Sequence, residues 1–204
     1  MLRLKLQILL RSVSLTCTCY VRFVAVCVAR ADSWYPEMFM LWGGGAPFEQ
    51  ASTEPNNTLV DSRNTKVKLL GDVAECWAEC HGLMKAGEPL VVCVASRSDE
   101  PSWARECLRK FIVTHGVSMM DVVTEQLAEI YKGSKRDHFA ALHKKTKIPY
   151  QRMCFFDDDM ANIRDVSSLG VHCIYTPDGV TKPLFANGLR AATAGSDVWE
   201  AFGK

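Results

Sequence analysis

The chain of 204 residues has the length of one ordinary domain, and its 48% hydrophobic and 23% charged residues exclude extensive disorder. The net charge of +1 hides an asymmetry, because residues 1–31 carry five basic side chains and no acidic one. The rest of the chain therefore has 19 basic against 23 acidic residues. A mildly acidic body without a basic stripe argues against nucleic acid as a partner.

The first thirty residues are apolar, basic and rich in Ser, Thr and Cys. This composition resembles a targeting presequence, so organelle targeting by residues 1–30 is one interpretation. Arg11 and Arg22 interrupt the hydrophobicity, so the segment lacks the roughly 20 apolar residues of a membrane span, and no membrane partner is expected. The other interpretation is an N-terminal extension over residues 1–20 followed by a first strand over 21–28. The two interpretations are compatible.

Nine cysteines are present, but their placement argues against a disulfide framework. Cys93, Cys154 and Cys173 lie inside apolar runs, where cysteine behaves as a small buried hydrophobe. Cys76 and Cys80 lie one helical turn apart, and no second pair follows at zinc-ligand spacing. The pattern predicts structural thiols in a reducing compartment, which favours a cytoplasmic location.

From residue 34 onward, apolar runs alternate with amphipathic patterns. Residues 34–66 are predicted to form a minimal cap or loop insertion: 34–48 are aromatic and glycine-rich, and 49–66 are polar and loop-like. Strands are then predicted over 90–95, 120–124, 152–156 and 171–175, and helices over 73–86 (N-cap Asp72), from Ser98 or Asp99 to 113, and over 136–147, 160–168 and 182–192. This alternation predicts an α/β, Rossmann-like three-layer domain over 21–195 with a mostly parallel sheet, followed by a tail over 196–204.

Polar side chains gather where three of these segments meet a helix, at positions where open α/β sheets bind ligands. The cluster Asp157–Asp159 offers oxygen ligands for Mg²⁺, or alternatively caps the following helix. Ser96 and Arg97 follow a buried strand and can bind a phosphate, or alternatively form an ordinary helix start with a solvated guanidinium. Lys135 stands just before a helix, where it is either solvated or a point charge beside a phosphate.

Other prominent residues have structural interpretations. His138 and His143 fall five apart on one predicted helix, which is poor spacing for a shared metal, so a solvated or capping role is expected. Trp77 and Trp103 occupy helical core positions.

Taken together, the motifs resemble the haloacid dehalogenase (HAD) superfamily of phosphohydrolases, and more closely its magnesium-dependent phosphatases. The segments that carry the resemblance are Trp34-Tyr-Pro36, Val94-Ala-Ser-Arg-Ser98, Ile130-Tyr-Lys-Gly-Ser-Lys135 with His138-Phe139, Phe155-Phe-Asp-Asp158 with Asn162-Ile163, and Leu169-Gly-Val171-His-Cys173. The resemblance covers residues 34–190 and implies a HAD-like fold with Mg²⁺ as cofactor. It also implies a monomer that hydrolyses small phosphomonoesters, such as phosphotyrosine or sugar phosphates.

The resemblance also implies roles for individual residues. Ser96 and Arg97 would contact the phosphoryl group, and Lys135 would neutralise its charge. Asp158 would ligate Mg²⁺, and Asp157 would support it or ligate it through water. The family's reaction passes through an aspartyl-phosphate that water then hydrolyses.

The first motif of the family, Phe-Asp-x-Asp, is not found at its expected place. Alignment backward from Trp34 puts Val28 at the nucleophile and Arg30 at the acid/base position. Valine has no nucleophilic atom, and arginine does not exchange protons near neutral pH. Asp32 is the only acid nearby, and it lies two residues beyond Arg30, or about 6–7 Å along a strand.

Three hypotheses follow. The chain is a phosphatase family member whose first motif has been replaced, for instance through an alternative or wrongly assigned start, so that this chain as written is impaired. Alternatively, it is a non-catalytic protein that binds phosphorylated ligands. The third hypothesis is a receiver-like module, which is weakened by the late position of the acidic cluster in the chain.

Overall fold

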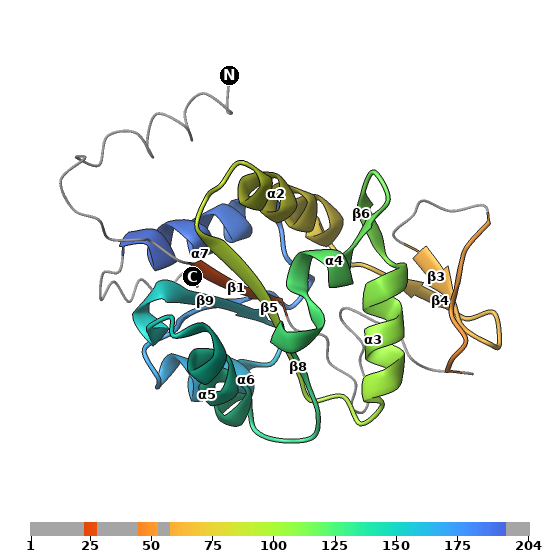
Figure 1. Ribbon diagram of the computed structural model, residues 1–204. Helices are drawn as coiled ribbons and strands as arrows, with labels where there is room; N and C mark the ends of the chain where they lie inside the picture. The colour runs from red at the N-terminus through yellow and green to blue at the C-terminus, as the bar shows by residue number, and fades with distance from the viewer. Residues whose placement is uncertain (1–22, 28–44, 53–57, 195–204) are drawn as a thin grey trace.

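The computed structural model describes residues 23–27, 45–52 and 58–194, and for 23–27 only the backbone path. Its centre is a five-stranded sheet in the order β10-β9-β1-β5-β8 (Figure 1), in which every neighbouring pair is parallel. The strands are β1 (Phe23–Cys27), β5 (Leu90–Ser96), β8 (Ala128–Ile130), β9 (Met153–Asp157) and β10 (His172–Tyr175).

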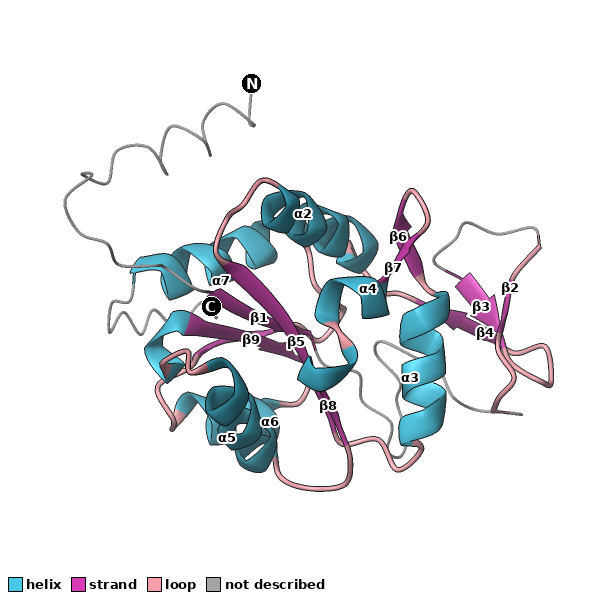
Figure 2. Ribbon diagram, in the orientation of Figure 1, coloured by secondary structure: helices cyan, strands magenta, loops and turns pink. Residues whose placement is uncertain are grey.

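Helices cover both faces of this sheet, with α5 and α6 on one face and α2 and α7 on the other (Figure 2). The described helices are α2 (Val73–Lys85), α3 (Pro101–Lys110), α4 (Met119–Val123), α5 (Lys135–Thr146), α6 (Met160–Ser167) and α7 (Lys182–Ala194), with short 3-10 turns η1 (Glu125–Leu127) and η2 (Tyr150–Arg152). The prediction of a three-layer α/β domain with a parallel sheet is therefore confirmed.

The all-apolar strands supply both layers of the core because successive side chains point to opposite faces. Along β5, Val92 and Val94 pack in the cluster beneath α2, whereas Cys93 and Ala95 pack with Phe139 of α5. The strand β9 divides its side chains between the same two clusters. Strands buried on both faces are expected to lack a polar side, and these two do.

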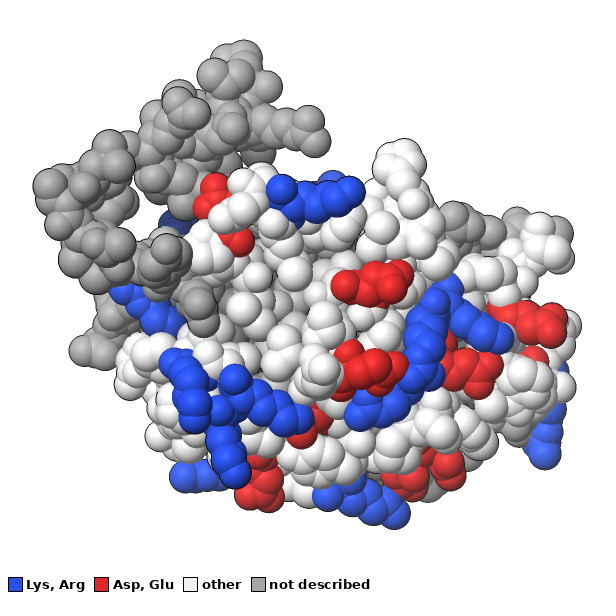
Figure 3. All heavy atoms as spheres, in the orientation of Figure 1, with Lys and Arg blue, Asp and Glu red and all other residues white. Residues whose placement is uncertain are grey.

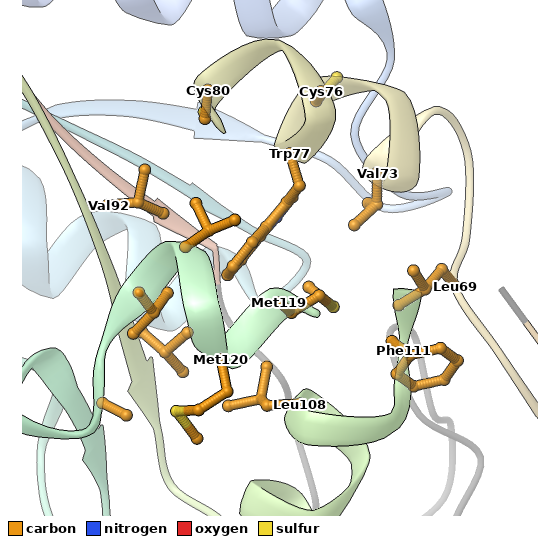
Figure 4. Close-up of a cluster of buried hydrophobic side chains, with 14 of the residues drawn as sticks. Leu69, Val73, Cys76, Trp77, Cys80, Val92, Leu108, Phe111, Met119 and Met120 are labelled. Carbon is orange, nitrogen blue, oxygen red and sulfur yellow. The ribbon is translucent and has the colours of Figure 1, made fainter. Parts of the chain in front are cut away.

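Helix α2 shows how its sequence spacing builds one of these layers. Its buried residues Val73, Cys76, Trp77 and Cys80 follow the i, i+3, i+4, i+7 spacing of an amphipathic helix. Figure 4 shows Trp77 extending from α2 into the space between Val92 and Met119. Trp77 is 2% exposed, so the indole ring fills the interior between α2, α4 and the sheet.

Replacing this ring is expected to be costly. The change Trp77→Ala should lower the free energy of unfolding by about 3–5 kcal/mol, because it removes a large buried ring and leaves a cavity. The measurement is urea unfolding followed by circular dichroism. The control is Glu79→Ala on the exposed side of the same helix, which should change stability by no more than about 0.5 kcal/mol. Equal effects of the two changes would contradict the packing described.

Buried thiols in the described core should be chemically inert. Burial raises the pKa of both Cys93 and Cys107 to about 12, so the reactive thiolate is scarce near neutral pH. We therefore expect both cysteines to resist iodoacetamide in the native protein and to react fully in urea, as read by peptide mass spectrometry. Rapid alkylation of either thiol under native conditions would show that its strand or helix opens locally.

Two sequence-based predictions about the region 98–130 are wrong. The segment 120–124, predicted as a strand, instead forms most of helix α4 and its C-cap Thr124, because Ser118 and Asp121 cap the start of that helix reciprocally. The helix predicted to reach 113 starts after Glu100 and ends at Lys110, and a hairpin of β6 (Ile112–Thr114) and β7 (Val117–Ser118) follows it. Strand β8, which pairs with β5 on the side opposite β1, was not predicted.

A small antiparallel sheet occupies part of the segment predicted as a cap, where 49–66 was predicted to be loop. Its strands are β2 (Glu49–Gln50), β3 (Thr58–Val60) and β4 (Lys66–Lys68). The sheet lies beside α3, apart from the central sheet (Figure 2). Phe48 contacts Trp103 of α3 edge-on at 6.4 Å between ring centroids, and its backbone N donates to Glu106 Oε1 at 2.9 Å. The predicted capping role remains a prediction.

The charge over α3 and the hydrophobicity of the described helices bear on binding to nucleic acid and to membranes. Figure 3 shows basic and acidic side chains close together over α3, where Arg105 and Arg109 both pair with Glu125. Among the helices in the described part of the chain, none combines the length and hydrophobicity needed to cross a bilayer.

Candidate functional site

The candidate site lies at the carboxyl edge of the central sheet. Ser96 is the last residue of β5, and Asp157 is the last residue of β9. Strand β1 lies between these two strands and pairs with both. Val28 and Arg30 follow β1 in the sequence but lie outside the described residues. The parallel order thus brings the ends of three strands to one place, as open α/β sheets do at their ligand sites.

Lys135 is buried at this edge, with 2% of its surface exposed. Its Nζ donates to the carbonyl oxygen of Ala95 at 2.7 Å and lies 3.5 Å from Asp157 Oδ2. The lysine is held there by the start of α5, where Ser134 and Asp137 cap the helix reciprocally. Burial lowers the pKa of Lys135 to about 8, although the charge of Asp157 opposes this shift. The solvated alternative for this lysine is therefore wrong.

Asp157 is also buried, and its two carboxylate oxygens differ. Oδ1 accepts hydrogen bonds from the backbone N of Asp159 at 2.7 Å and from Asn162 Nδ2 at 3.0 Å. Oδ2 has no hydrogen-bond partner within the described residues and lies near Lys135 only at ion-pair distance. Burial raises the pKa of Asp157, and Lys135 and these hydrogen bonds act in the opposite direction. One buried oxygen with open acceptor capacity is what a cation or a proton would complete.

The donor set fits Mg²⁺, which takes oxygen ligands and keeps several waters. Asp157 offers its open oxygen, and Asp158 follows directly with a partly exposed side chain. The described residues hold no group of three or more His, Cys, Asp or Glu side chains that could enclose a metal by themselves. A site of this composition suits a metal that shares its coordination with water and a substrate.

Asp159 caps a helix, which was the predicted alternative to metal binding for the acidic cluster. It is the N-cap of α6, and its Oδ1 accepts from the backbone N of Ala161 at 2.8 Å. The cluster therefore divides, since Asp159 starts the helix while Asp157 points into the interior beside Lys135.

Asn162 connects the acidic and basic parts of the edge. It is 3% exposed, its Nδ2 donates to Asp157, and its Oδ1 accepts from Arg97 Nη1 at 3.4 Å. A continuous set of contacts therefore runs from Arg97 through Asn162 and Asp157 to Lys135. Sequence reasoning included Asn162 in a motif without giving it a role. Its signal was an amide three residues after the helix cap, placed where it can both donate and accept.

The predicted site residues Ser96, Arg97, Lys135, Asp157 and Asp158 thus all lie at one edge of the sheet. Ser96 is fully buried, and its Oγ accepts from the backbone N of Ser98 at 3.3 Å. The edge presents a hydroxyl, a guanidinium, an ammonium and two carboxylates, and this combination can bind a phosphoryl dianion together with a divalent cation. Of the two roles predicted for His138, solvated or capping, the solvated one is wrong, since its side chain is fully buried.

Comparison with known proteins agrees with this geometry. The family model described as Acid Phosphatase matches residues 33–194, a span that begins after Val28 and Arg30. The human protein Magnesium-dependent phosphatase 1 is 35% identical over 143 residues, which cover 70% of this chain and 72% of that protein. A HAD-like hydrolase superfamily protein of Schizosaccharomyces pombe is 31% identical over 127 residues, covering 62% of this chain and 70% of its own length.

Among solved structures, one similar chain is the N-terminal part of a Bacteroides fragilis protein containing a phosphatase domain complexed with Mg. It has a TM-score of 0.47 and 16% identity, and the match covers 84% of this chain and 40% of that one. The family model and the two relatives, rather than this distant structure, decide the assignment. The chain belongs to the Acid Phosphatase family, and the predicted resemblance to the magnesium-dependent phosphatases of the HAD superfamily is confirmed.

Proposed function

We propose that this chain binds a small phosphomonoester and Mg²⁺ at the carboxyl edge of its sheet, and that as written it hydrolyses the ester slowly. The observation that carries the proposal is the buried ion pair of Lys135 and Asp157, with its open carboxylate oxygen, linked through Asn162 to Arg97. A buried ion pair is expensive to form, and it contributes little to stability by itself. A pair with unfilled acceptor capacity at a strand end is better explained by ligand binding than by packing.

Each basic group has a separate role toward the phosphoryl oxygens. The Lys135 ammonium, held out of bulk water, would interact with a dianion more strongly than an exposed lysine would. Arg97 offers two parallel N–H donors, and its contact with Asn162 would fix the orientation of this fork. Ser96 would add a hydroxyl donor from the end of β5. Asp157 and Asp158 would hold Mg²⁺, which when bound supplies positive charge to the phosphoryl oxygens.

Slow hydrolysis is expected from the types of residue that follow β1 in the sequence. In the family reaction, an aspartate oxygen attacks phosphorus as the bond to the leaving oxygen breaks, and a second aspartate gives that oxygen its proton. Water then cleaves the aspartyl-phosphate. Val28 and Arg30 occupy the two expected positions, and neither side chain can perform these steps. We therefore expect binding without efficient turnover.

The test measures binding and turnover on the same protein. Inorganic phosphate should raise the melting temperature in the presence of Mg²⁺, while p-nitrophenyl phosphate should be hydrolysed only slowly, at a rate above that without protein but far from efficient turnover. Robust turnover abolished by chelation would contradict the assignment of Val28 and Arg30. No stabilisation by phosphate would contradict the proposed binding site.

The second candidate is a protein whose role is to bind a phosphorylated ligand without turning it over, and the residue types at positions 28 and 30 favour it. Phosphotyrosine and sugar phosphates are the proposed ligand classes. A comparison of free phosphate with phosphotyrosine and glucose 6-phosphate by calorimetry decides between them. A ligand that binds much more tightly than free phosphate and is recovered intact would support this second candidate.

The lowered pKa of Lys135 predicts how the affinity for an anion depends on pH. Sulfate remains a dianion throughout the range of interest, so a change in its affinity reports on the protein. Because the pKa of Lys135 is lowered to about 8, sulfate must recruit a proton to this amine at higher pH. In a chelating buffer, the dissociation constant should therefore rise above pH 8 by up to about tenfold per pH unit. Calorimetric titrations at several pH values measure this, and a flat profile would contradict it.

A further inference from the structure

His138 is a buried titratable group close to the site that has no role so far. It lies in the first turn of α5, three residues after Lys135, and it is fully buried. Its Nδ1 lies 2.6 Å from the carbonyl oxygen of Ser134, and its Nε2 lies 3.1 Å from the carbonyl oxygen of Tyr131. The imidazole also stacks on the ring of Tyr131, with 4.2 Å between centroids and an interplanar angle of 16°.

These contacts join both ends of the short loop that precedes Lys135. The backbone N of Tyr131 donates to the carbonyl oxygen of Ser96 at 3.1 Å, so the start of this loop is fixed to the end of β5. The end of the loop is Ser134, the N-cap of α5. Gly133 lies above the ring pair, since a Cβ there would come within 3.8 Å of both rings. The two stacked rings therefore pack against the loop at Gly133.

We propose that His138 is a positioning residue, which fixes the 131–134 loop so that Lys135 and Ser96 are held in register for an anionic ligand. The inference rests on the proposed phosphate site. The physical reason is that Lys135 must keep its ammonium between Ala95 and Asp157, and the loop carries the backbone from which this side chain extends. Releasing either end of the loop would let Lys135 shift relative to Ser96. Small displacements of binding groups are costly for affinity.

The geometry also indicates which ring nitrogen carries the proton. A neutral imidazole has one N–H, and both nitrogens face carbonyl oxygens, so only one of them is satisfied. Burial lowers the pKa of His138, which favours the neutral form. In the tautomer with its N–H on Nδ1, the shorter contact is a hydrogen bond donated to the Ser134 carbonyl, and the contact with Tyr131 is made by the stacked rings. An asparagine amide can reproduce a donor at Nδ1, whereas a glutamine amide reproduces one at Nε2.

The chain offers a matched control on the same helix. His143 has its Nδ1 2.6 Å from the carbonyl oxygen of Ile148, and its ring lies 4.7 Å from that of Tyr150. It therefore also combines a carbonyl contact with an aromatic neighbour, near the other end of α5, although its ring is only half-buried and lies at 32° to that of Tyr150. Replacement of either histidine by leucine removes one carbonyl-bonded ring from one helix.

The experiment compares His138→Leu, His138→Asn, His138→Gln and His143→Leu. Urea unfolding gives the stability of each, and calorimetry with inorganic phosphate gives its affinity. His138→Leu should weaken phosphate binding by about tenfold, the equivalent of one net hydrogen bond, while His143→Leu keeps the wild-type affinity. His138→Asn should bind more tightly than His138→Gln. If His138→Leu does not fold, the order of the Asn and Gln variants decides.

Three results would overturn the inference. These are wild-type phosphate affinity in every His138 variant that folds, equal weakening by the His143 change, or binding by the Gln variant as tight as by the Asn variant. Failure of the proposed function is distinguishable, because in that case the wild-type protein itself would not bind phosphate.

Discussion

The double change Val28→Asp and Arg30→Asp is expected to raise the rate of p-nitrophenyl phosphate hydrolysis by about 10²–10⁴-fold, with the gain dependent on Mg²⁺. The reason lies in the place of β1 in the sheet. This strand pairs with β5 on one side and β9 on the other, and those strands end at Ser96 and Asp157. Carboxylates supplied after β1 would therefore enter an edge that already has cations and a partial metal site.

Single changes and a control separate the two roles. Val28→Asp alone supplies a nucleophile but leaves Arg30 in place of the proton donor, so only part of the gain is expected. Ala29→Asp adds the same charge at the position between them, where the family motif Phe-Asp-x-Asp requires no carboxylate. It should leave turnover unchanged.

The comparison is made at equal folded protein, with melting temperature and phosphate affinity measured for each variant. No gain in the double variant, despite wild-type phosphate binding, would contradict the assignment of residues 28 and 30. An equal gain from Ala29→Asp would contradict it as well. Loss of phosphate binding in the double variant would instead show that two added carboxylates repel the ligand.

The sequence alone predicts a strand or helix correctly where the residues of the segment itself determine its structure. The apolar run ending at Ser96 and the run ending at Asp157 could be identified as buried strands, because both are apolar on each face. The helix 136–147 was predicted to within one residue at each end of α5, and its capping pair Ser134 and Asp137 lies in the local sequence.

The sequence was insufficient where tertiary contacts override local preference. Strand β8 has three residues and contains Glu129, which is buried because Lys145 of α5 pairs with it. No local pattern reveals that partner. The segment around Val122 and Val123 has high strand propensity, but the reciprocal cap of Ser118 and the burial of all but one of its residues favour a helix.

The candidate site shows the same division. The residue types at strand ends indicated Ser96, Arg97, Lys135, Asp157 and Asp158. Their connection through Asn162, and the burial of His138 beneath the loop, depend on neighbours that are distant in sequence. Composition cannot distinguish a buried histidine bonded to carbonyl groups from a solvated one.

Lys135→Met is expected to weaken sulfate or phosphate binding by at least about 100-fold and to lower the free energy of unfolding by about 3–5 kcal/mol. Methionine fills a similar volume without the charge, so the change isolates the ammonium. Binding is lost because the buried cation at the ligand edge is gone. Stability is lost because Asp157 would remain buried with its charge uncompensated.

A second variant separates these two effects. In Lys135→Met with Asp157→Asn, the amide removes the uncompensated charge, so most of the stability should return. Anion binding should not return, because the cation is still missing. The order expected from urea unfolding is therefore the wild-type protein first, the double variant close to it, and Lys135→Met alone well below both. The order expected from calorimetry places both variants far below the wild-type protein.

The two orders test different claims about the same pair of residues. If Lys135→Met binds sulfate as well as the wild-type protein, the ammonium serves only to neutralise Asp157, and the edge is a structural ion pair rather than an anion site. If the double variant remains as unstable as Lys135→Met, the loss of stability comes from the packing of the aliphatic part of Lys135 and not from the unpaired charge of Asp157. The proposal requires two results together: weak anion binding by both variants, and recovered stability in the double variant. Both are expected if the buried Lys135 ammonium costs desolvation free energy and binds the anionic ligand.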